Sequence, residues 1–314
     1  MKTKFCTTCC LFLTAMIWGF AFVAQFFGAD AVGPFAMNGL RFPLGTLSII
    51  PVMLLFEKGK SGKTERKKTL IASLLAGTAL FAASTLQQVG LIVSGSVGKA
   101  GFITGLYTIF VPIACYIFFR KKTGINVVIA AAIAVVGISL LCINPKEGFS
   151  FGLGELLLTI GSFFWTAHVV LVDKLGKELR SLHFAFGQFA VCSALCMIVM
   201  FIFERPEISQ IKAAAVPILY AGLMSVGVAY TLQIVSQKHS DPTFAAIVFS
   251  TESVFGAIGG VLFGIDNISP VGYTGCALIF AGIVISQLDF GKKKNKAVIA
   301  DTELSLPEKA EEKL

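Results

Sequence analysis

Long apolar segments alternate with short polar connections along almost the whole chain. A helix needs about 20 apolar residues to cross the hydrocarbon core of a bilayer, and the segments have about this length. Hydrocarbon offers no hydrogen-bond partners to an open backbone, so we expect helices in every segment. The pattern predicts an all-α integral membrane protein with ten transmembrane helices, at about residues 6–28, 33–56, 69–94, 97–119, 125–143, 152–173, 182–203, 213–237, 241–264 and 269–289.

The composition supports this class, because 55% of the 314 residues are hydrophobic and 14% are charged. The net charge of +8 lies in short runs between apolar segments, which indicates basic loops beside a membrane and no nucleic-acid partner. The apolar run after MKTKF continues to about Phe27, too long for a typical signal peptide, so we expect a retained first span. Residues 291–314 are polar and of mixed charge, and we expect a disordered cytoplasmic tail.

The basic residues also predict an orientation, because loops rich in lysine and arginine stay on the cytoplasmic side. Arg41 lies within a span. If the N-terminus is cytoplasmic, the outer side holds four basic residues, Lys99, Lys146, Arg205 and Lys212, and every other one is cytoplasmic. We therefore expect a multi-pass protein with both termini in the cytoplasm. The short loops suit a plasma membrane, such as the bacterial inner membrane.

The sequence repeats itself weakly after about half its length. WGFAFVAQFFGADAVGPFAMNGLRF from Trp18 has a counterpart in WTAHVVLVDKLGKELRSLHFAFGQF from Trp165. TLQQVGLIVSGS from Thr85 similarly matches TLQIVSQKHS from Thr231. Five spans in each repeat give the second repeat the opposite orientation, a device that many secondary transporters use to build a site between the repeats. We expect the two inverted five-helix repeats at residues 1–145 and 146–290.

A carboxylate lies near the middle of the ninth segment, FAAIVFSTESVFGAIGGVLFG. A charge at that depth costs about 2.5–3.5 kcal/mol or more and usually marks a functional site, which makes Glu252 the strongest candidate. The alternative is a structural role, either a pair with Arg41 or a hydrogen bond to a neighbouring helix. Gly256, Gly260 and Gly264 recur every four residues, so we expect a seam where another helix packs closely. Pro112 is expected to kink the fourth span.

Other polar side chains lie inside the predicted spans, and each has a structural alternative. Arg41 could pair with backbone carbonyls at a helix end, and His168 could be a neutral hydrogen-bonding residue between helices. Lys99 lies near enough to the outer surface to be interfacial. The glutamines could join neighbouring helices. Trp18 and Trp165 are too deep for the aromatic belt, so they either pack against neighbours or line a cavity.

Motifs of soluble enzymes are missing from the sequence, which contains no GxSxG, Walker A or HExxH pattern. Cys6 and Cys9 have CxxC spacing without a second pair or a nearby histidine, so we expect no metal or other cofactor. Glu252 and His168 are the one pair that an intramembrane enzyme could use, and we do not expect an enzyme. A non-transporting membrane scaffold or sensor remains the alternative to a transporter.

Several segments together resemble one known family. They are AMIWGFAFVAQ in the first span, LRF at 40–42, KAGFITGLYTIFVPI from Lys99, VVGISLL, LGELLLTIGSFFWTAHVVLVDKL, FSTESVFGAIGGVLFG and GCALIFAGIVIS. Their order and spacing resemble the drug/metabolite transporter superfamily, and within it the ten-span EamA-like family. The resemblance implies two inverted five-helix halves around a central cavity, and movement of small metabolites, often outward. Ser253 departs from the pattern, because many relatives carry proline there, and FGIDNIS departs where relatives often place a glutamate.

These observations predict a secondary transporter that moves a small polar or amphipathic metabolite, most simply an amino-acid-like compound, outward by alternating access. Transport is expected to be either proton-linked or purely downhill. In the proton-linked version Glu252 carries the proton, with His168 in reserve because imidazole titrates near neutral pH. The expected partners are the substrate, membrane lipid and protons, with a homodimer left open. The residues predicted to line the cavity are Trp18, Gln87, Tyr107, Trp165, His168, Gln233 and Glu252.

Overall fold

The computed structural model describes residues 2–59, 62–120, 124–142, 152–266 and 269–287. Within these ranges the chain forms helices and no strand. The first half contains α1 (Lys2–Val32), α2 (Pro34–Phe56), α3 (Lys63–Ser94), α4 (Val97–Thr104), α5 (Tyr107–Phe119) and α6 (Ile125–Cys142). The second half contains α7 (Leu153–Gly176), α8 (Ser181–Phe203), α9 (Ile208–Ala213), α10 (Ala215–Leu219), the π-helix η1 (Tyr220–Ala229), α11 (Tyr230–Gln237), α12 (Pro242–Phe249), α13 (Glu252–Leu262) and α14 (Pro270–Gln287).

These elements build ten helical spans. Eight continuous helical segments are long and apolar enough to cross a membrane, and α6 and α14 add two shorter apolar helices. Three spans change geometry along their length, since one contains α4 and α5, another α10, η1 and α11, and a third α12 and α13. The predicted all-α membrane fold with ten spans is confirmed. The predicted tail, residues 291–314, lies outside the described residues.

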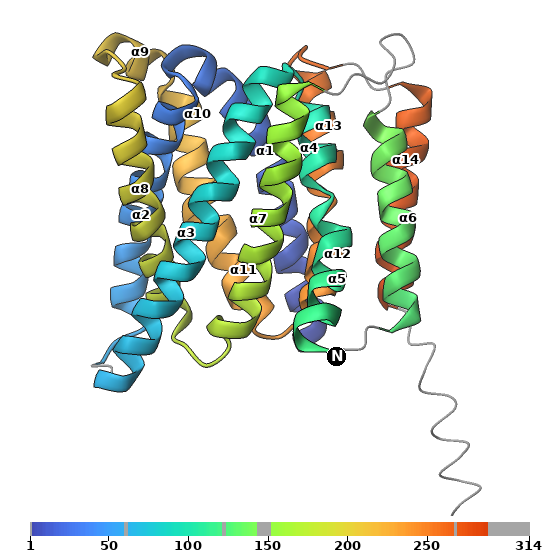
Figure 1. Cartoon of the computed structure of the whole chain (residues 1–314), viewed down its shortest axis with the longest axis horizontal. Helices are drawn as coiled ribbons and strands as arrows, with labels where there is room; N and C mark the ends of the chain where they lie inside the picture. Colours follow the sequence, from blue (N-terminus) through green and yellow to red (C-terminus); the bar gives the residue numbers. More distant parts are fainter. Residues whose placement is uncertain (1, 60–61, 121–123, 143–151, 267–268, 288–314) are drawn as a thin grey trace, which may run out of the picture.

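The two halves pack as copies of one arrangement with opposite orientation (Figure 1). α2 packs along α8, and α6 packs along α14, so each of these helices contacts its own counterpart. α3 packs on α7 and α8, while η1, which lies in the counterpart of α3, packs on α1 and α2. This exchange of partners is what a two-fold axis in the membrane plane produces.

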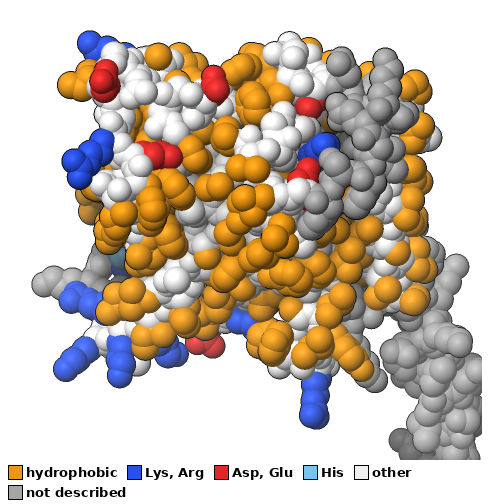
Figure 2. All heavy atoms as spheres, turned by 45° about the horizontal axis from the view of Figure 1, so that its top comes forward, with side chains coloured by type: hydrophobic (Ala, Val, Ile, Leu, Met, Phe, Trp, Pro, Cys, Tyr) orange, Lys and Arg blue, Asp and Glu red, His pale blue; other side chains and the backbone are white. Residues whose placement is uncertain are grey.

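The outer surface has the character of a membrane protein. Figure 2 shows hydrophobic side chains over most of the visible face, with Lys and Arg mainly along the lower edge and Asp and Glu mainly toward the upper edge. Large apolar side chains are strongly exposed, such as Phe56 at 77% and Val216 at 76%. Such a continuous apolar surface is unstable in water and stable in lipid.

A reciprocal pair of caps joins the lower ends of α2 and α8. The Glu57 carboxylate follows the last residue of α2 and accepts hydrogen bonds from the backbone N–H groups of Leu182 and His183, each at 3.1 Å, in the first turn of α8. In return, the Arg180 guanidinium precedes α8 and donates to the carbonyl oxygens of Glu57, Lys58 and Gly59 at the end of α2. Each side chain satisfies backbone groups that the partner helix leaves open at its end.

The upper ends of the same helices carry the matching contact from the other repeat. Glu204 follows the last residue of α8, and its Oε2 accepts a hydrogen bond of 2.6 Å from the backbone N–H of Ala36 in the first turn of α2. Gly33 precedes α2 with φ at +92°, and a Cβ there would collide with the Glu204 carboxylate. Glu57 and Glu204 thus perform one task at opposite ends, as inverted repeats require.

Candidate functional site

Two broken spans meet at the centre of the molecule. The break between α4 and α5 falls at Gly105 and Leu106, and the break between α12 and α13 falls at Ser250 and Thr251. Broken helices at this depth are tolerated where the backbone lines a cavity, and they often form transporter sites. Pro112, which is predicted to kink the fourth span, lies within α5 and beyond the break.

Local chemistry stabilises the second break without a proline. The Ser250 and Thr251 hydroxyls donate back to the carbonyl oxygens of Ile247 and Val248, at 2.6 and 2.7 Å. Such bonds from a side chain to a nearby carbonyl compete with the regular helical hydrogen bonds and are common where a helix bends or breaks. The Ser253 hydroxyl donates to the carbonyl of Gly101 at 2.8 Å and ties α13 to α4. The serine that departs from the family pattern therefore joins the two broken spans.

Tyr107 and Glu252 are the first residues after the two breaks, so they occupy corresponding positions in the two repeats. The Tyr107 hydroxyl donates a hydrogen bond of 3.2 Å to Glu252 Oε1. Both side chains are buried, with exposed fractions of 3% and 4%. Glu252 also lies in the first turn of α13, where the helix dipole favours a negative charge.

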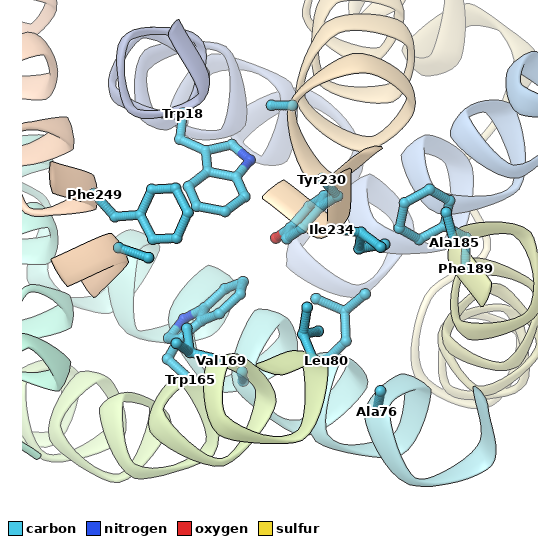
Figure 3. Packing of buried hydrophobic residues seen from close by; sticks show 14 of the residues in the cluster. Trp18, Ala76, Leu80, Trp165, Val169, Ala185, Phe189, Tyr230, Ile234 and Phe249 are labelled. Atoms are coloured by element: carbon cyan, nitrogen blue, oxygen red, sulfur yellow. The ribbon is translucent and has the colours of Figure 1, made fainter. Parts of the chain in front are cut away.

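Four aromatic rings surround the neighbouring space, and we call them the aromatic cage: Trp18, Trp165, Tyr230 and Phe249 (Figure 3). The Trp18 ring centroid lies 4.7 Å from that of Tyr230 and 5.2 Å from that of Phe249. Trp165 lies parallel to Tyr230 at 6.1 Å, with an interplanar angle of 9°. Trp18 and Trp165 are repeat counterparts with centroids 6.3 Å apart, so the two-fold axis passes near the cage.

The cage and the two breaks enclose one central cavity, with about 20 Å³ of space for the centre of a water molecule. This space holds about one water molecule, so the cavity is small in this conformation. Six of the seven predicted residues line the cavity, namely Trp18, Gln87, Tyr107, Trp165, Gln233 and Glu252. The other lining residues are Phe22, Gln25, Arg41, Thr104, Val169, Ser225, Tyr230 and Phe249.

His168 is the predicted residue that the structure places elsewhere. It is fully buried, and its Nε2 lies 3.2 Å from Gln188 Oε1 on α8. Its ring meets the edges of Trp165 and Tyr230 from outside, at 5.9 and 6.1 Å. In this conformation His168 supports the aromatic cage and does not line the cavity among the residues described. His168 and Glu252 therefore do not face one space, as a catalytic pair would.

Arg41 lines the cavity, although it is not among the residues that the sequence predicts to line it. Its side chain is 1% exposed, so it does not reach either membrane surface. Arg41 Nε donates to Asn38 Oδ1 at 2.9 Å, and Asn38 Nδ2 donates to the carbonyl of Ser84 at 3.1 Å. Within the described part of the chain, Arg41 Nη2 has no hydrogen-bond partner. The sequence does show an arginine within a span, which could have indicated a functional residue. That its side chain points inward is known only from the way α2 packs in the structure.

Other polar atoms of the lining also lack partners among the described residues. They are Gln25 Oε1, Trp165 Nε1 and Gln233 Oε1. Gln87, in contrast, donates to Thr104 Oγ1 at 3.2 Å. Leaving a buried polar group without a hydrogen bond costs about 1–3 kcal/mol, so a tightly packed core would not retain several around one space. The lining offers donors, acceptors and both signs of charge to a small ligand.

α1 and α13 approach closely beside the cavity. A Cβ at Gly19 would lie 2.6 Å from the Glu252 carbonyl oxygen and 2.8 Å from Gly256 N, so no larger residue fits there. The predicted glycine seam on α13 was therefore right at Gly256. It was wrong at Gly260, where an added Cβ would first meet the side chain of Asp266, and at Gly264, which has φ at +72° and where an added Cβ would meet no described atom within 4 Å.

Polar contacts close the upper end of the broken spans. Asp266, just beyond α13, accepts hydrogen bonds from Ser96 Oγ at 2.8 Å and from Gly98 N at 2.7 Å at the start of α4. Lys99 Nζ lies 3.9 Å from Glu155 Oε1 on α7. Asp266 lies in the FGIDNIS segment, which departs from the family pattern. These contacts hold α4, α7 and α13 together above the cavity.

Comparison with known proteins identifies the family. The model of the EamA-like transporter family matches the chain twice, at residues 7–143 and 152–288. The chain belongs to the EamA-like transporter family. The predicted drug/metabolite transporter resemblance is thereby confirmed, and the protein is a multi-pass membrane transporter.

Relatives with similar sequences carry transporter names. An "Uncharacterized transporter" of Archaeoglobus fulgidus is 28% identical over 280 residues, which cover 88% of this chain and 84% of that protein. "Uncharacterized transporter YoaV" of Bacillus subtilis is 23% identical over 291 residues, covering 89% and 96%. One solved crystal structure has a TM-score of 0.71 at 19% identity and covers 96% of this chain and 99% of that one, which supports the fold.

Proposed function

We propose that the protein is a secondary transporter that exports a small amino-acid-like metabolite across the plasma membrane by alternating access. One observation carries this proposal: Arg41 and Glu252, of opposite charge, line one cavity and come from different repeats. A ligand with a carboxylate and an ammonium group complements both charges. Arginine binds carboxylates in a planar, bidentate manner, and aromatic faces attract ammonium groups.

Because the two charged residues lie on different repeats, ligand binding can be coupled to the movement of one repeat against the other. Arg41 lies on α2 of the first repeat, and Glu252 on α13 of the second. When one repeat rocks against the other, the distance between the charges changes, so a ligand that bridges them favours the closed state. The small cavity fits such a closed state without ligand. In the proton-linked version, a proton on Glu252 takes the place of the ligand's ammonium group.

The position of the basic residues supports the proposed topology, with both termini in the cytoplasm. α1 begins at the lower edge in Figure 1, the edge near which Figure 2 shows most Lys and Arg side chains. The cytoplasmic loops of membrane proteins carry this excess of basic residues. The opposite edge, where α9 lies, is then the outer face.

A binding test on the purified protein in detergent examines the ligand class. Ligands are compared as matched sets: an amino acid, the amine that lacks its carboxylate, and the acid that lacks its amino group. A ligand that binds the folded state raises its melting temperature with concentration. The proposal predicts that a zwitterion raises the melting temperature more than either partner molecule, and that this difference disappears in Arg41→Gln. Equal responses to all three members of every set, or a difference that survives in Arg41→Gln, would contradict it.

A further inference from the structure

A second, much larger space lies on the outside of the bundle, between α5 and α6. It has about 1050 Å³ of space for the centre of a water molecule and opens outward. We call it the α5–α6 groove, and its lining is apolar except for one tyrosine hydroxyl. The lining residues are Ile109, Pro112, Ile113, Tyr116, Ile117, Val128, Ala131, Ala132 and Val135. This groove is separate from the central cavity, with which it shares no lining residue.

The packing of α6 leaves the groove open. α6 packs mainly along α14, and the two helices stand side by side at one edge of the bundle (Figure 1). The lining of the groove includes the small side chains of Ala131 and Ala132 on α6 and the ring of Pro112 on α5. The groove runs from Ile109, close to the central break, to Ile117 in the last turn of α5. It therefore covers the half of the membrane nearest the lower edge.

Only an apolar occupant of membrane origin suits this position. The groove opens toward the hydrocarbon, and Tyr116 and Ile117 are 65% and 62% exposed. Water in an apolar space without polar partners is unfavourable, whereas an acyl chain from the bilayer fills the space and makes van der Waals contacts with its walls. An acyl chain enters the groove sideways from the bilayer without crossing a polar layer.

Two cations lie at the lower end of α5, the helix that forms one wall of the groove. Arg120 follows the last residue of α5 and is exposed, and it continues the helical spacing of Ile113 and Ile117. Lys174 on α7 is also exposed, and its Nζ lies 4.0 Å from the ring centroid of Phe119. Neither cation has an acidic partner in the described portions of the chain. Basic groups at the cytoplasmic mouth of such a groove attract anionic headgroups.

We propose that the α5–α6 groove binds an anionic phospholipid, with an acyl chain along Pro112 and Ala132 and the headgroup phosphate at Arg120 and Lys174. The two cations complement the negatively charged headgroup of such a lipid, and the apolar lining complements its acyl chain. The lipid lies on the same helix as Tyr107, so its binding stabilises α5 below the central break. The inference is independent of the proposed substrate, because the groove is separate from the cavity.

The test uses purified full-length protein in detergent, with phosphatidylglycerol as the probe and phosphatidylcholine of the same acyl chains as the neutral lipid. Melting temperature and native mass spectrometry report binding. The double variant Arg120→Gln/Lys174→Gln removes the headgroup site, and Ala132→Trp fills the groove. The control, Lys63→Gln/Lys67→Gln, removes two exposed cations from the same side but far along the chain from the groove.

Phosphatidylglycerol is expected to raise the melting temperature more than phosphatidylcholine in the wild-type protein and in the control. The Arg120→Gln/Lys174→Gln variant should bind it about 30-fold more weakly, from roughly 1 kcal/mol for each cation. Ala132→Trp should lose the bound lipid in mass spectra while it elutes as the wild type does in gel filtration. Equal binding by all four proteins would overturn the proposal. So would a wild-type dimer that Ala132→Trp converts to a monomer without any lipid loss, since the groove would then hold a second copy.

Discussion

Tyr107 and Glu252 occupy corresponding positions in the two inverted repeats, and a hydrogen bond of 3.2 Å joins them across the centre of the molecule. Each is the first helical residue after a break in its span. The two repeats therefore place different chemistry at one position: a neutral donor in the first and a carboxylate in the second. The asymmetry places one titratable carboxyl at this position, in the second repeat, opposite a neutral hydroxyl in the first.

Glu252→Gln tests whether that charge carries a coupling proton. The substitution keeps the size of the side chain and removes its titration, so a proton-linked transporter should lose its response to a pH gradient. Transport of a substrate in proteoliposomes, with and without an imposed gradient, measures the effect. Tyr107→Phe is the matched control, because it removes the hydrogen bond and leaves the carboxylate. An unchanged gradient response in Glu252→Gln would exclude the proton-carrying role.

Arg41 should determine affinity through Nη2, which has no hydrogen-bond partner among the described residues. A hydrogen bond from a charged group contributes about 1.5–3 kcal/mol, so Arg41→Gln should weaken binding of an anionic group by roughly 10- to 100-fold. Arg41→Lys keeps the charge without the planar fork, so it should lose part of this affinity. Titration of melting temperature against ligand measures both. Lys212→Gln, a basic residue in α9 that does not line the cavity, should bind as the wild type does.

The sequence predicts those features of the site that belong to a single helix. Apolar length predicts the ten spans, and helical spacing predicts that Trp18 and Gln25 share a face. The direction of that face depends on which helices pack beside it. Arg41 shows this limit, because its spacing to Asn38 is evident, while its inward direction follows from α2 packing along α8.

His168 shows a second limit. It lies three residues after Trp165, about 60° away around the helix, and this rotation is enough to turn it from the cavity toward Gln188. The break at Gly105 and Leu106 and the π-helix η1 also escaped prediction. In η1, the carbonyl of Ser225 accepts a hydrogen bond of 3.4 Å from Trp18 Nε1 on α1, a contact between residues far apart in the sequence.

The cap formed by Glu57 should make stability depend on pH. Burial alone raises the pKa of the Glu57 carboxyl, but hydrogen bonds from the His183 ring and from the backbone of Leu182 and His183 outweigh it, so the pKa lies below its ordinary value of 4.5. A carboxyl whose pKa falls on folding stabilises the protein above the ordinary value. This contribution is lost as pH falls through the lower, folded-state pKa.

Glu57→Gln should therefore lower the melting temperature at pH 7 and flatten its decline below about pH 4.5. Losing these charged hydrogen bonds should lower the free energy of unfolding by about 1.5–3 kcal/mol at most, because the position is partly exposed. Melting curves between pH 7 and pH 3.5 measure the effect. Glu178→Gln is the control, because Glu178 is 78% exposed and its ion pair with Lys68 adds little. Parallel pH curves for the wild type and Glu57→Gln would contradict the role of this cap.

Gly19 should tolerate no side chain, because a Cβ there would meet the backbone of α13 at Glu252 and Gly256. Gly19→Ala is expected to lower the stability by about 1–3 kcal/mol, the usual cost of overpacking. It should also impair transport by shifting the helix that carries Glu252. Gly62→Ala is the matched control, because a Cβ at Gly62 has no neighbour within 4 Å. A melting temperature that falls equally in both variants would contradict the close approach of α1 and α13.

The central claim is that one zwitterion bridges Arg41 and Glu252 between the two repeats. Counterflow in proteoliposomes tests it most directly, with labelled amino acid outside and a panel of unlabelled amino acids, amines and carboxylic acids trapped inside. The account predicts that at least one trapped zwitterion drives accumulation of label, that the matched amine and acid do not, and that Arg41→Gln abolishes the accumulation while Lys212→Gln preserves it. Accumulation that persists in Arg41→Gln, or that amines and acids drive as well as zwitterions do, would contradict the account.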